Sequence, residues 1–342
     1  MTPESRYRTN DLAKSVVAFS AAYQEDNLLA RGLGLEHLKE LLERLTRTIL
    51  RKGGNIAYGG YWKKEPQNFT YHLLEIVKAE QEDGSRGGTQ QGKPIGKLYN
   101  YAAWPHDLEI SPTIEANVIS TCRIVRFTQK DAGFQSDEIV AVPGTDKTGR
   151  ELFNTAVTLS AMRCKMMQGI TIKLPDLPPE EIPPVTARIL LGGKEKGYSG
   201  FLPGIMEEAL TTFEKKCPVY LLGGFGGAAQ VLADAILNTD TVRPKELTAK
   251  WQFEQTPALE QLKRLSRRFR RPEGIRSTDA LLEDVQAFIE KARGNPAEAL
   301  QTGLDDQETR VLMQTHDIAK VVRLVIKGLL RNSAGDVTAA HQ

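Results

Sequence analysis

Short apolar runs that end in paired glycines are the feature that most restricts how this chain can fold. There are three of them: 55–58 before Gly59-Gly60, 187–191 before Gly192-Gly193, and 218–222 before Gly223-Gly224. Segments with helical spacing of apolar residues lie between the runs. Near-continuously apolar strands that alternate with helices are typical of a parallel sheet covered on both faces. The sequence therefore predicts an α/β fold with a mainly parallel sheet.

The hydrophobic spacing places further elements along the chain. The expected helices are 35–52, 69–79, 152–168, the stretch after Pro203, 278–293 and 316–330. The other expected strands are 15–19, 98–104, 119–127 and 139–142, and the expected irregular segments are 20–34, 81–96 and the proline-rich 174–185. We therefore expect one domain over residues 1–240 and a helical region over 241–342 that forms a cap or an interface.

Charge and composition exclude several classes of protein. The formal net charge is only +2, so no strong field attracts nucleic acid or an anionic membrane. A basic run, RRFRRPEG at 267–274, is usually a solvated face, and we do not expect a nucleic-acid partner from it. No apolar run approaches the roughly 20 residues that a membrane span needs. We expect a soluble, cytoplasmic protein.

The sequence contains no pattern for a metal or a resident cofactor. Its three cysteines, Cys122, Cys164 and Cys217, are widely spaced, which suits a reducing compartment and no disulfide framework. Its five histidines lack the spacing of metal ligands. Neither a G-x-S-x-G nor a G-x-x-x-x-G-K-[ST] motif is present. We expect neither a metal nor a cofactor.

The glycine pairs point to a ligand at the carboxyl edge of the sheet, where α/β proteins bind their ligands. Glycine allows close approach to a ligand, and amides at a helix start favour an anion such as phosphate. Three pairs at one edge indicate a nucleotide-like ligand. Polar and aromatic groups expected at this edge are Ser20, Tyr23, Tyr58, Trp104, Arg163, Glu207 and Glu208. Each also has an ordinary structural explanation, such as a salt bridge for Arg163 or a core position for Trp104.

The motifs GGNIAYGG, NYAAWP, AMRCKM and LGG…GYSGFLPGIMEEAL…PVYLLGGFGG resemble the SLOG superfamily of Rossmann-like domains, over about Ser15 to Ile236. This resemblance implies a Rossmann-like sheet with helices on both faces. LOG-type phosphoribohydrolases in that group carry an arginine and a P-G-G-x-G-T-x-x-E motif. Arg163 would match the arginine, and the motif would be split between Gly192-Gly193 and Gly204–Glu208.

Two departures from the LOG motif count against simple nucleoside-monophosphate hydrolysis, and the chain looks more similar to the antiphage branch of the superfamily, which includes the sensor domains of Thoeris-type systems. Ile205 stands where the motif has threonine, and residues 194–203 interrupt it. The resemblance then implies a sensor of ADP-ribose, cyclic ADP-ribose or an NAD-like molecule. Such a sensor would act as a homo-oligomer with a separate effector protein.

An enzyme remains open beside the sensor, as does a scaffold without a ligand. In the sensor, Arg163 pairs a phosphate or ribose oxygen and Glu208 accepts ribose hydroxyls. In an N-glycoside hydrolase that releases a base from a nucleotide, Glu208 and Arg163 are the catalytic pair. We rank the sensor first. The expected ligand site adds Tyr198, Gly204 and Phe225 to the residues above, with Tyr23, Tyr58, Tyr198 or Trp104 stacking on a base.

Overall fold

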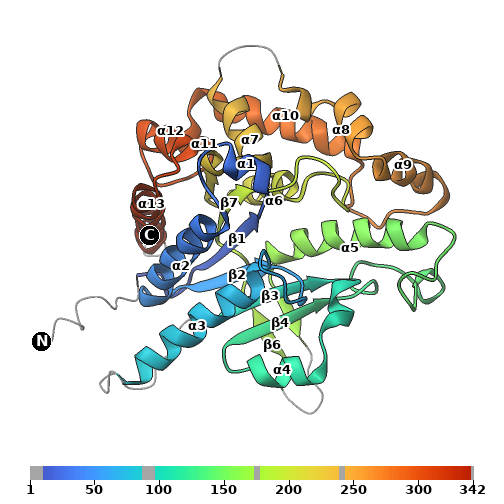
Figure 1. Cartoon of the computed structure of the whole chain (residues 1–342), viewed down its shortest axis with the longest axis horizontal. Coiled ribbons are helices and arrows are strands. Elements are labelled where there is room, and N and C mark those ends of the chain that lie inside the picture. The colour runs from blue at the N-terminus through green and yellow to red at the C-terminus, as the bar shows by residue number, and fades with distance from the viewer. Residues whose placement is uncertain (1–10, 87–96, 173–177, 239–242, 340–342) are drawn as a thin grey trace, which may run out of the picture.

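A six-stranded parallel sheet forms the centre of the protein, as the sequence predicts (Figure 1). The computed structural model describes residues 11–86, 97–172, 178–238 and 243–339. The strands lie in the order β4-β3-β2-β1-β7-β8, and every neighbouring pair is parallel. Their bounds are β1 Val16–Ala22, β2 Asn55–Gly59, β3 Leu98–Ala103, β4 Cys122–Phe127, β7 Ala187–Gly192 and β8 Val219–Leu222.

Helices cover both faces of the sheet, which is why its strands are apolar on both sides. Val16 and Ala18 of β1 face one core, with α5 (Arg150–Met166), α6 (Gly204–Glu214) and α7 (Gly227–Leu237). Val17 and Phe19 face the other, with α2 (Leu35–Arg51) and α3 (Phe69–Arg86). This alternation follows from the period of two along a strand. The fold is therefore α/β and Rossmann-like.

The C-terminal part is helical, as expected, and packs on the α/β part. Its helices are α8 Ala249–Gln255, α9 Ala258–Arg268, α10 Thr278–Gly294, α11 Pro296–Ala299, α12 Asp306–Gln314 and α13 Ile318–Ala339. Helix α10 contacts α6 and α7, while α13 contacts α2 on the opposite side. The boundary that we place at residue 240 stays a prediction. None of the helices in the described ranges is long and apolar enough to cross a membrane.

Several predicted elements are corrected by the structure. No strand forms at 139–142, because the Gln129 side chain hydrogen-bonds the backbone of Val140. It accepts from the N–H (3.0 Å) and donates to the carbonyl (2.9 Å). The segment 20–34 is not all loop, since β1 continues beside β7 to Ala22 and α1 (Glu25–Leu29) follows.

The other corrections concern the ends of elements. Residues 81–86 extend α3, and the rest of the loop expected there, 87–96, lies outside the described residues. The strand expected from 119 begins at Cys122, after α4 (Pro112–Val118). The proline-rich segment contributes β6 (Glu180–Ile182), which pairs antiparallel with β5 (Ile170–Ile172), while 174–177 lie outside the described residues.

The start of α5 carries an acid-sensitive contact at Asp146. Desolvation alone would raise the pKa of this carboxyl group, but hydrogen bonds from Thr148 and from the backbone of Glu151 (3.0 Å) outweigh it and lower the pKa to about 2. This folded value lies below the unfolded value of about 3.9. The stabilisation is therefore present above pH 4 and is lost as the pH falls from about 4 to about 2.

We predict that Asp146→Ala destabilises the protein by roughly 0.5–1 kcal/mol at pH 6, a value reduced for solvent exposure. Urea unfolding at several pH values between 2 and 6 measures the difference from the wild type. The difference should shrink toward pH 2. Asp137→Ala is the control, because this exposed aspartate has no side-chain partner in the described part of the chain. A difference for Asp146→Ala that does not depend on pH would contradict the assignment.

Candidate functional site

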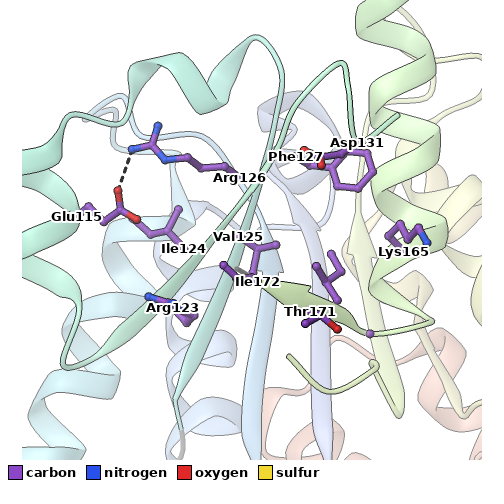
Figure 2. Close-up of a pocket in the computed structure, with 12 residues that line it drawn as sticks. Glu115, Arg123, Ile124, Val125, Arg126, Phe127, Asp131, Lys165, Thr171 and Ile172 are labelled. Atoms are coloured by element: carbon purple, nitrogen blue, oxygen red, sulfur yellow. Dashed lines mark hydrogen bonds and ion pairs between the residues drawn. The ribbon is translucent and has the colours of Figure 1, made fainter. Parts of the chain in front are cut away.

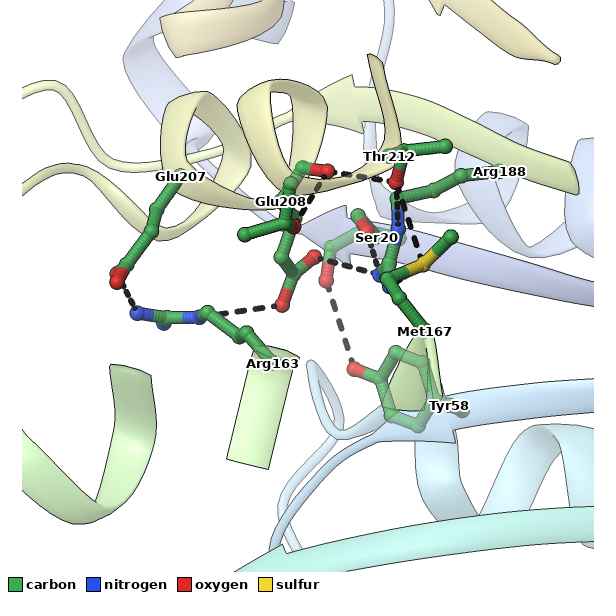
Figure 3. Close-up of polar contacts among 10 residues, drawn as sticks. Ser20, Tyr58, Arg163, Met167, Arg188, Glu207, Glu208 and Thr212 are labelled. Carbon is green, nitrogen blue, oxygen red and sulfur yellow. Dashed lines mark hydrogen bonds and ion pairs between the residues drawn. The ribbon is translucent and has the colours of Figure 1, made fainter. Parts of the chain in front are cut away.

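Charged side chains gather where the sheet changes direction. The chain builds β1, β2, β3 and β4 toward one edge, then returns to place β7 on the other side of β1. In open α/β sheets, ligands bind outside the carboxyl ends of the strands at such a point. Figure 3 shows Arg163, Arg188, Glu207 and Glu208 here, and we call these four residues the charge cluster.

Arg163, near the end of α5, points to the first turns of α6. Its Nη1 donates to Glu207, and its Nε lies 3.4 Å from Glu208 Oε1. Arg163 is 8% exposed and Glu207 3%. Burial by itself would lower the pKa of Arg163, but the two carboxylates raise it above its ordinary value. Arg163 therefore stays a cation in a nearly closed environment.

Arg188 was not predicted, and it completes the cluster from within β7. Its side chain is fully buried, and it donates from Nε to Thr212 (2.8 Å) and from Nη1 to Ser20 (3.0 Å). The same Nη1 lies 3.2 Å from Glu208 Oε2. Burial, more than any other cause, lowers the pKa of Arg188. The signal in the sequence was an arginine inside the run ARILLG, where a strand buried on both faces should be apolar.

Glu208 therefore joins two arginines, one through each carboxylate oxygen. Arg163 faces Oε1, and Arg188 faces Oε2. Two cations and two carboxylates make the cluster neutral. Burying charges needs this kind of pairing.

Helix α6 begins with Gly204, which has no side chain and so leaves room for Arg163. A Cβ atom at Gly204 would lie 2.7 Å from Arg163 Nη2, and one at Gly200 would lie 3.3 Å from Nη1. Among the described residues, Nη2 has no hydrogen-bond acceptor. The nitrogen that faces the helix start is thus the one with donor capacity left for a ligand.

The glycines after β7 allow three elements to meet. Gly192 has φ +64°, and a Cβ there would lie 2.4 Å from the carbonyl oxygen of Ala22 at the end of β1. The carbonyl of Gly193 accepts from the N–H of Ala228 in α7 (3.0 Å). A Cβ at Gly227 would lie 2.5 Å from that same carbonyl oxygen. These glycines bring the ends of β1 and β7 against the start of α7.

A second arginine missed by the sequence analysis lies at the start of α7. A Cβ at Gly226 would lie 3.1 Å from Arg31 Nη1, and the guanidinium donates to the Asn27 carbonyl and to Gln230. Arg31 forms no ion pair within the described ranges. It follows α1, in a stretch that we expected to be loop, so its position could not be inferred. A cation beside a helix start is a suitable place for phosphate.

The other predicted residues lie at varying distances from the cluster. Tyr58 is nearly buried, and its hydroxyl lies 3.4 Å from the Ala21 carbonyl; burial raises its pKa. Tyr23 is half-buried just after β1. The buried hydroxyl of Tyr198 donates to Gln252 (2.6 Å). Trp104 is buried at the end of β3, two strands from β1.

The remaining predicted glycines and Phe225 pack on the protein itself. A Cβ at Gly60 would lie 2.4 Å from Thr70 Oγ1, and Gly59 ends β2 beside it. A Cβ at Gly224 would lie 2.3 Å from the Thr315 carbonyl oxygen, just after α12, and one at Gly223 would lie 2.5 Å from the Met313 carbonyl oxygen. Phe225 is 1% exposed. Close approach of the chain's own backbone accounts for Gly223 and Gly224, and side chains of Thr70 and Tyr58 account for Gly60, whereas a Cβ at Gly59 would meet only Met162 Cε at 3.5 Å.

A groove of about 600 Å³ lies away from the cluster, along the edge strand β4 (Figure 2). It is lined by Arg123, Arg126, Lys165 and Thr171, among others, and by none of the predicted site residues. We place the candidate site at the charge cluster, because it joins the first turns of α6 to β7 at the point where the sheet changes direction. No group of three metal-ligating side chains occurs in the described part of the chain.

The fold and the position of the cluster define a Rossmann-like protein with its candidate site at the β1–β7 reversal. The SLOG cluster2 family model matches residues 11–312. The chain therefore belongs to the SLOG family, which is associated with the binding or processing of nucleotide-related molecules. The match continues past Ile236, where the sequence resemblance ended, and extends through α8 to α11 into α12. No curated protein matches the chain.

Proposed function

We propose that this protein binds a nucleotide-derived small molecule of the ADP-ribose, cyclic ADP-ribose or NAD type at the charge cluster, without turning it over. The observation that carries the proposal is the meeting of Arg163 with Glu207 and Glu208 at the start of α6. Carboxylates beside a fixed guanidinium suit a sugar with neighbouring hydroxyls, since carboxylates accept hydrogen bonds and the guanidinium donates them.

The phosphates of such a ligand belong at the start of α7. The cluster is neutral and contains two carboxylates, which repel a phosphate. Gly226 has Arg31 beside it, and no carboxylate forms an ion pair with Arg31 in the described residues. Gly193 lies between the two places, against Ile205 of α6 on one side and Gly227 on the other. A ribose at α6 joined to a diphosphate at α7 fits this arrangement.

Binding is favoured over hydrolysis by the contacts of Glu208. A general base or nucleophile needs an oxygen that faces the substrate. Both Glu208 oxygens face arginines instead, at 3.4 Å and 3.2 Å. The second candidate, an N-glycoside hydrolase, is supported by the retained pairing of Arg163 with Glu208. It requires ligand binding to pull Glu208 away from at least one arginine.

A signalling role, in an antiphage or stress response, follows from the resemblance to Thoeris-type sensors, and with it a homo-oligomer and a separate effector protein. The contacts of the 194–203 loop support such a role. The backbone N–H of Gly197 donates to Thr256 (3.0 Å), and Thr278 donates to the Phe201 carbonyl (2.7 Å). The hydroxyl of Tyr198 donates a hydrogen bond to the side chain of Gln252. A ligand that moves this loop would move α8 and α10 as well.

We predict that Arg163→Lys weakens ligand binding although the charge is kept. Lysine cannot reproduce the planar fork that Arg163 presents to two carboxylates and a ligand. Loss of one charge-assisted contact is worth about 1.5–3 kcal/mol, which is more than tenfold in affinity. Calorimetric titration of ADP-ribose, cyclic ADP-ribose and NAD measures the change.

Arg276→Lys is the matched control. Arg276 also lies between two carboxylates, Glu214 (2.5 Å) and Asp284 (2.9 Å), but Glu214 is at the opposite end of α6 from Glu207. It should keep wild-type affinity. Equal affinity in Arg163→Lys and in the wild type would remove Arg163 from the binding site.

A further inference from the structure

The proposed function leaves the basic run of the sequence without a role. The segment 258–276, which we call the α9 basic segment, has seven cationic side chains and two acidic ones. The whole chain has a net charge of only +2, so the rest of it is net negative. The positive charge is therefore concentrated in one short stretch.

The structure places most of this charge in solvent and without acidic partners. Arg264, Arg267, Arg268 and Arg270 are exposed. Within the described residues, none of these four forms an ion pair. The ion pairs of the segment there are those of Lys263 with Asp279 and of Arg276 with Glu214 and Asp284. Arg271 is half-buried, and its Nη1 has no hydrogen-bond partner there. The segment therefore presents uncompensated positive charge to solvent.

Helix geometry puts three of the arginines on one face. Arg264, Arg267 and Arg268 are spaced i, i+3 and i+4, so they lie side by side on α9. The opposite face is apolar: Leu259 and Leu262 are buried. Leu265 packs on the start of α5, where a Cβ at Gly149 would lie 2.9 Å from it.

The end of helix α9 is fixed to the fold. Phe269 is buried under the guanidinium of Arg150, which lies 4.0 Å from the ring centroid, and Arg268 lies 5.1 Å from the same ring. Figure 1 shows α9 at the periphery of the molecule, remote from α13. The arginines are thus presented outward on a firmly packed support.

We propose that the α9 basic segment binds the phosphodiester backbone of nucleic acid. Six of its seven cations are arginines, which match phosphate oxygens bidentately. Helix α9 is roughly 16 Å long, about five phosphate spacings of one strand. Phosphate contacts need neither apolar surface nor sequence readout.

Two other anionic partners fit the segment less well. Protein interfaces rely on buried aromatic or aliphatic anchors. The exposed large apolar side chains of the described residues are Leu29, Leu108, Ile119 and Val142, all outside the segment. An amphipathic helix on a membrane inserts its apolar face, whereas that of α9 is already buried against α5.

The test measures binding of the full chain to a fluorescent 20-base-pair DNA duplex and to a single strand of equal length, by anisotropy from 50 to 300 mM KCl. The variant is Arg264→Gln/Arg267→Gln/Arg268→Gln, since glutamine keeps helix propensity. The slope of log affinity against log salt is negative. We expect its magnitude to be smaller in the variant than in the wild type by about two to three, near 0.9 for each lost phosphate contact. Affinity at 100 mM should fall at least tenfold.

A charge-matched control separates a local site from net charge. The control variant is Lys78→Gln/Lys320→Gln/Arg323→Gln. It removes one cation from α3 and two from α13, and none of these three side chains forms an ion pair within the described ranges. It should bind like the wild type. The proposal is overturned if the wild type binds neither nucleic acid, or if the control loses as much affinity. Tighter, α9-dependent binding to polyglutamate or to phosphatidylserine vesicles than to nucleic acid would also overturn it, in favour of an acidic protein or a membrane.

Discussion

Glu208→Gln should destabilise the protein by about 3–5 kcal/mol, the scale for removing one partner of a buried ion pair. Glu208 is the only carboxylate in the described residues that pairs with Arg188. Arg163 would keep Glu207, but the fully buried Arg188 would keep only neutral partners: Ser20, Thr212, the Met167 sulfur and the new amide. Denaturant unfolding at pH 7, compared with the wild type, gives the loss.

We attribute this loss to Arg188, which is left buried without a carboxylate partner, and removing its charge as well tests this cause. Methionine fills much of the space of the arginine stem without its charge, so Glu208→Gln/Arg188→Met should recover at least about 2 kcal/mol relative to Glu208→Gln, as when a buried pair is replaced by apolar groups. A double variant that is less stable than either single variant would show that Arg188 and Glu208 are not coupled in this way.

Gly227→Ala is the second large effect, and it follows from space at the start of α7. A Cβ at this position would lie 2.5–2.7 Å from three backbone atoms of Gly192 and Gly193, which cannot move away as a side chain can. The residue also has φ +65°, a strained value for alanine. Strain and overpacking together should cost about 3–5 kcal/mol in unfolding free energy.

Gly197→Ala separates the two causes. Gly197 has the same φ of +65°, but no atom lies within 4 Å of its Cβ position. This variant should lose only about 1–2 kcal/mol, the part due to left-handed backbone. If both variants lose the same amount by denaturant unfolding, close packing between β7 and α7 is not what requires Gly227.

The sheet could be predicted because its strands are short and mostly apolar, and because glycines end or follow three of them, β2, β7 and β8. Runs such as those at 55–58 and 187–191 contain the whole signal locally. The false strand at 139–142 contained the same signal. There the N–H and carbonyl of Val140 form hydrogen bonds with the side chain of Gln129 instead of with a neighbouring strand, and no local pattern reveals this partner. Local apolarity indicates burial, but the hydrogen-bond partner depends on the rest of the fold.

The candidate site was predicted in part. Arg163, Glu207 and Glu208 were singled out from a helix start and a split motif, and the structure brings them together. Arg188 and Arg31 were not, because each acts through residues distant in sequence: Glu208 for the first, the start of α7 for the second. At Gly223-Gly224 the backbone of Met313 and Thr315, at the end of α12, lies against the glycines, and the ligand contact expected there stays a prediction.

The central claim is that the charge cluster holds a nucleotide-derived ligand and does not cleave it. The most direct measurement titrates wild-type protein with ADP-ribose, cyclic ADP-ribose and NAD in a calorimeter, then analyses the same samples by chromatography for released adenine or nicotinamide. We predict saturable binding of at least one ligand that Arg163→Lys weakens more than tenfold, and no released base. Base release by the wild type would contradict the claim in favour of a hydrolase, and an absence of both binding and release would contradict it altogether.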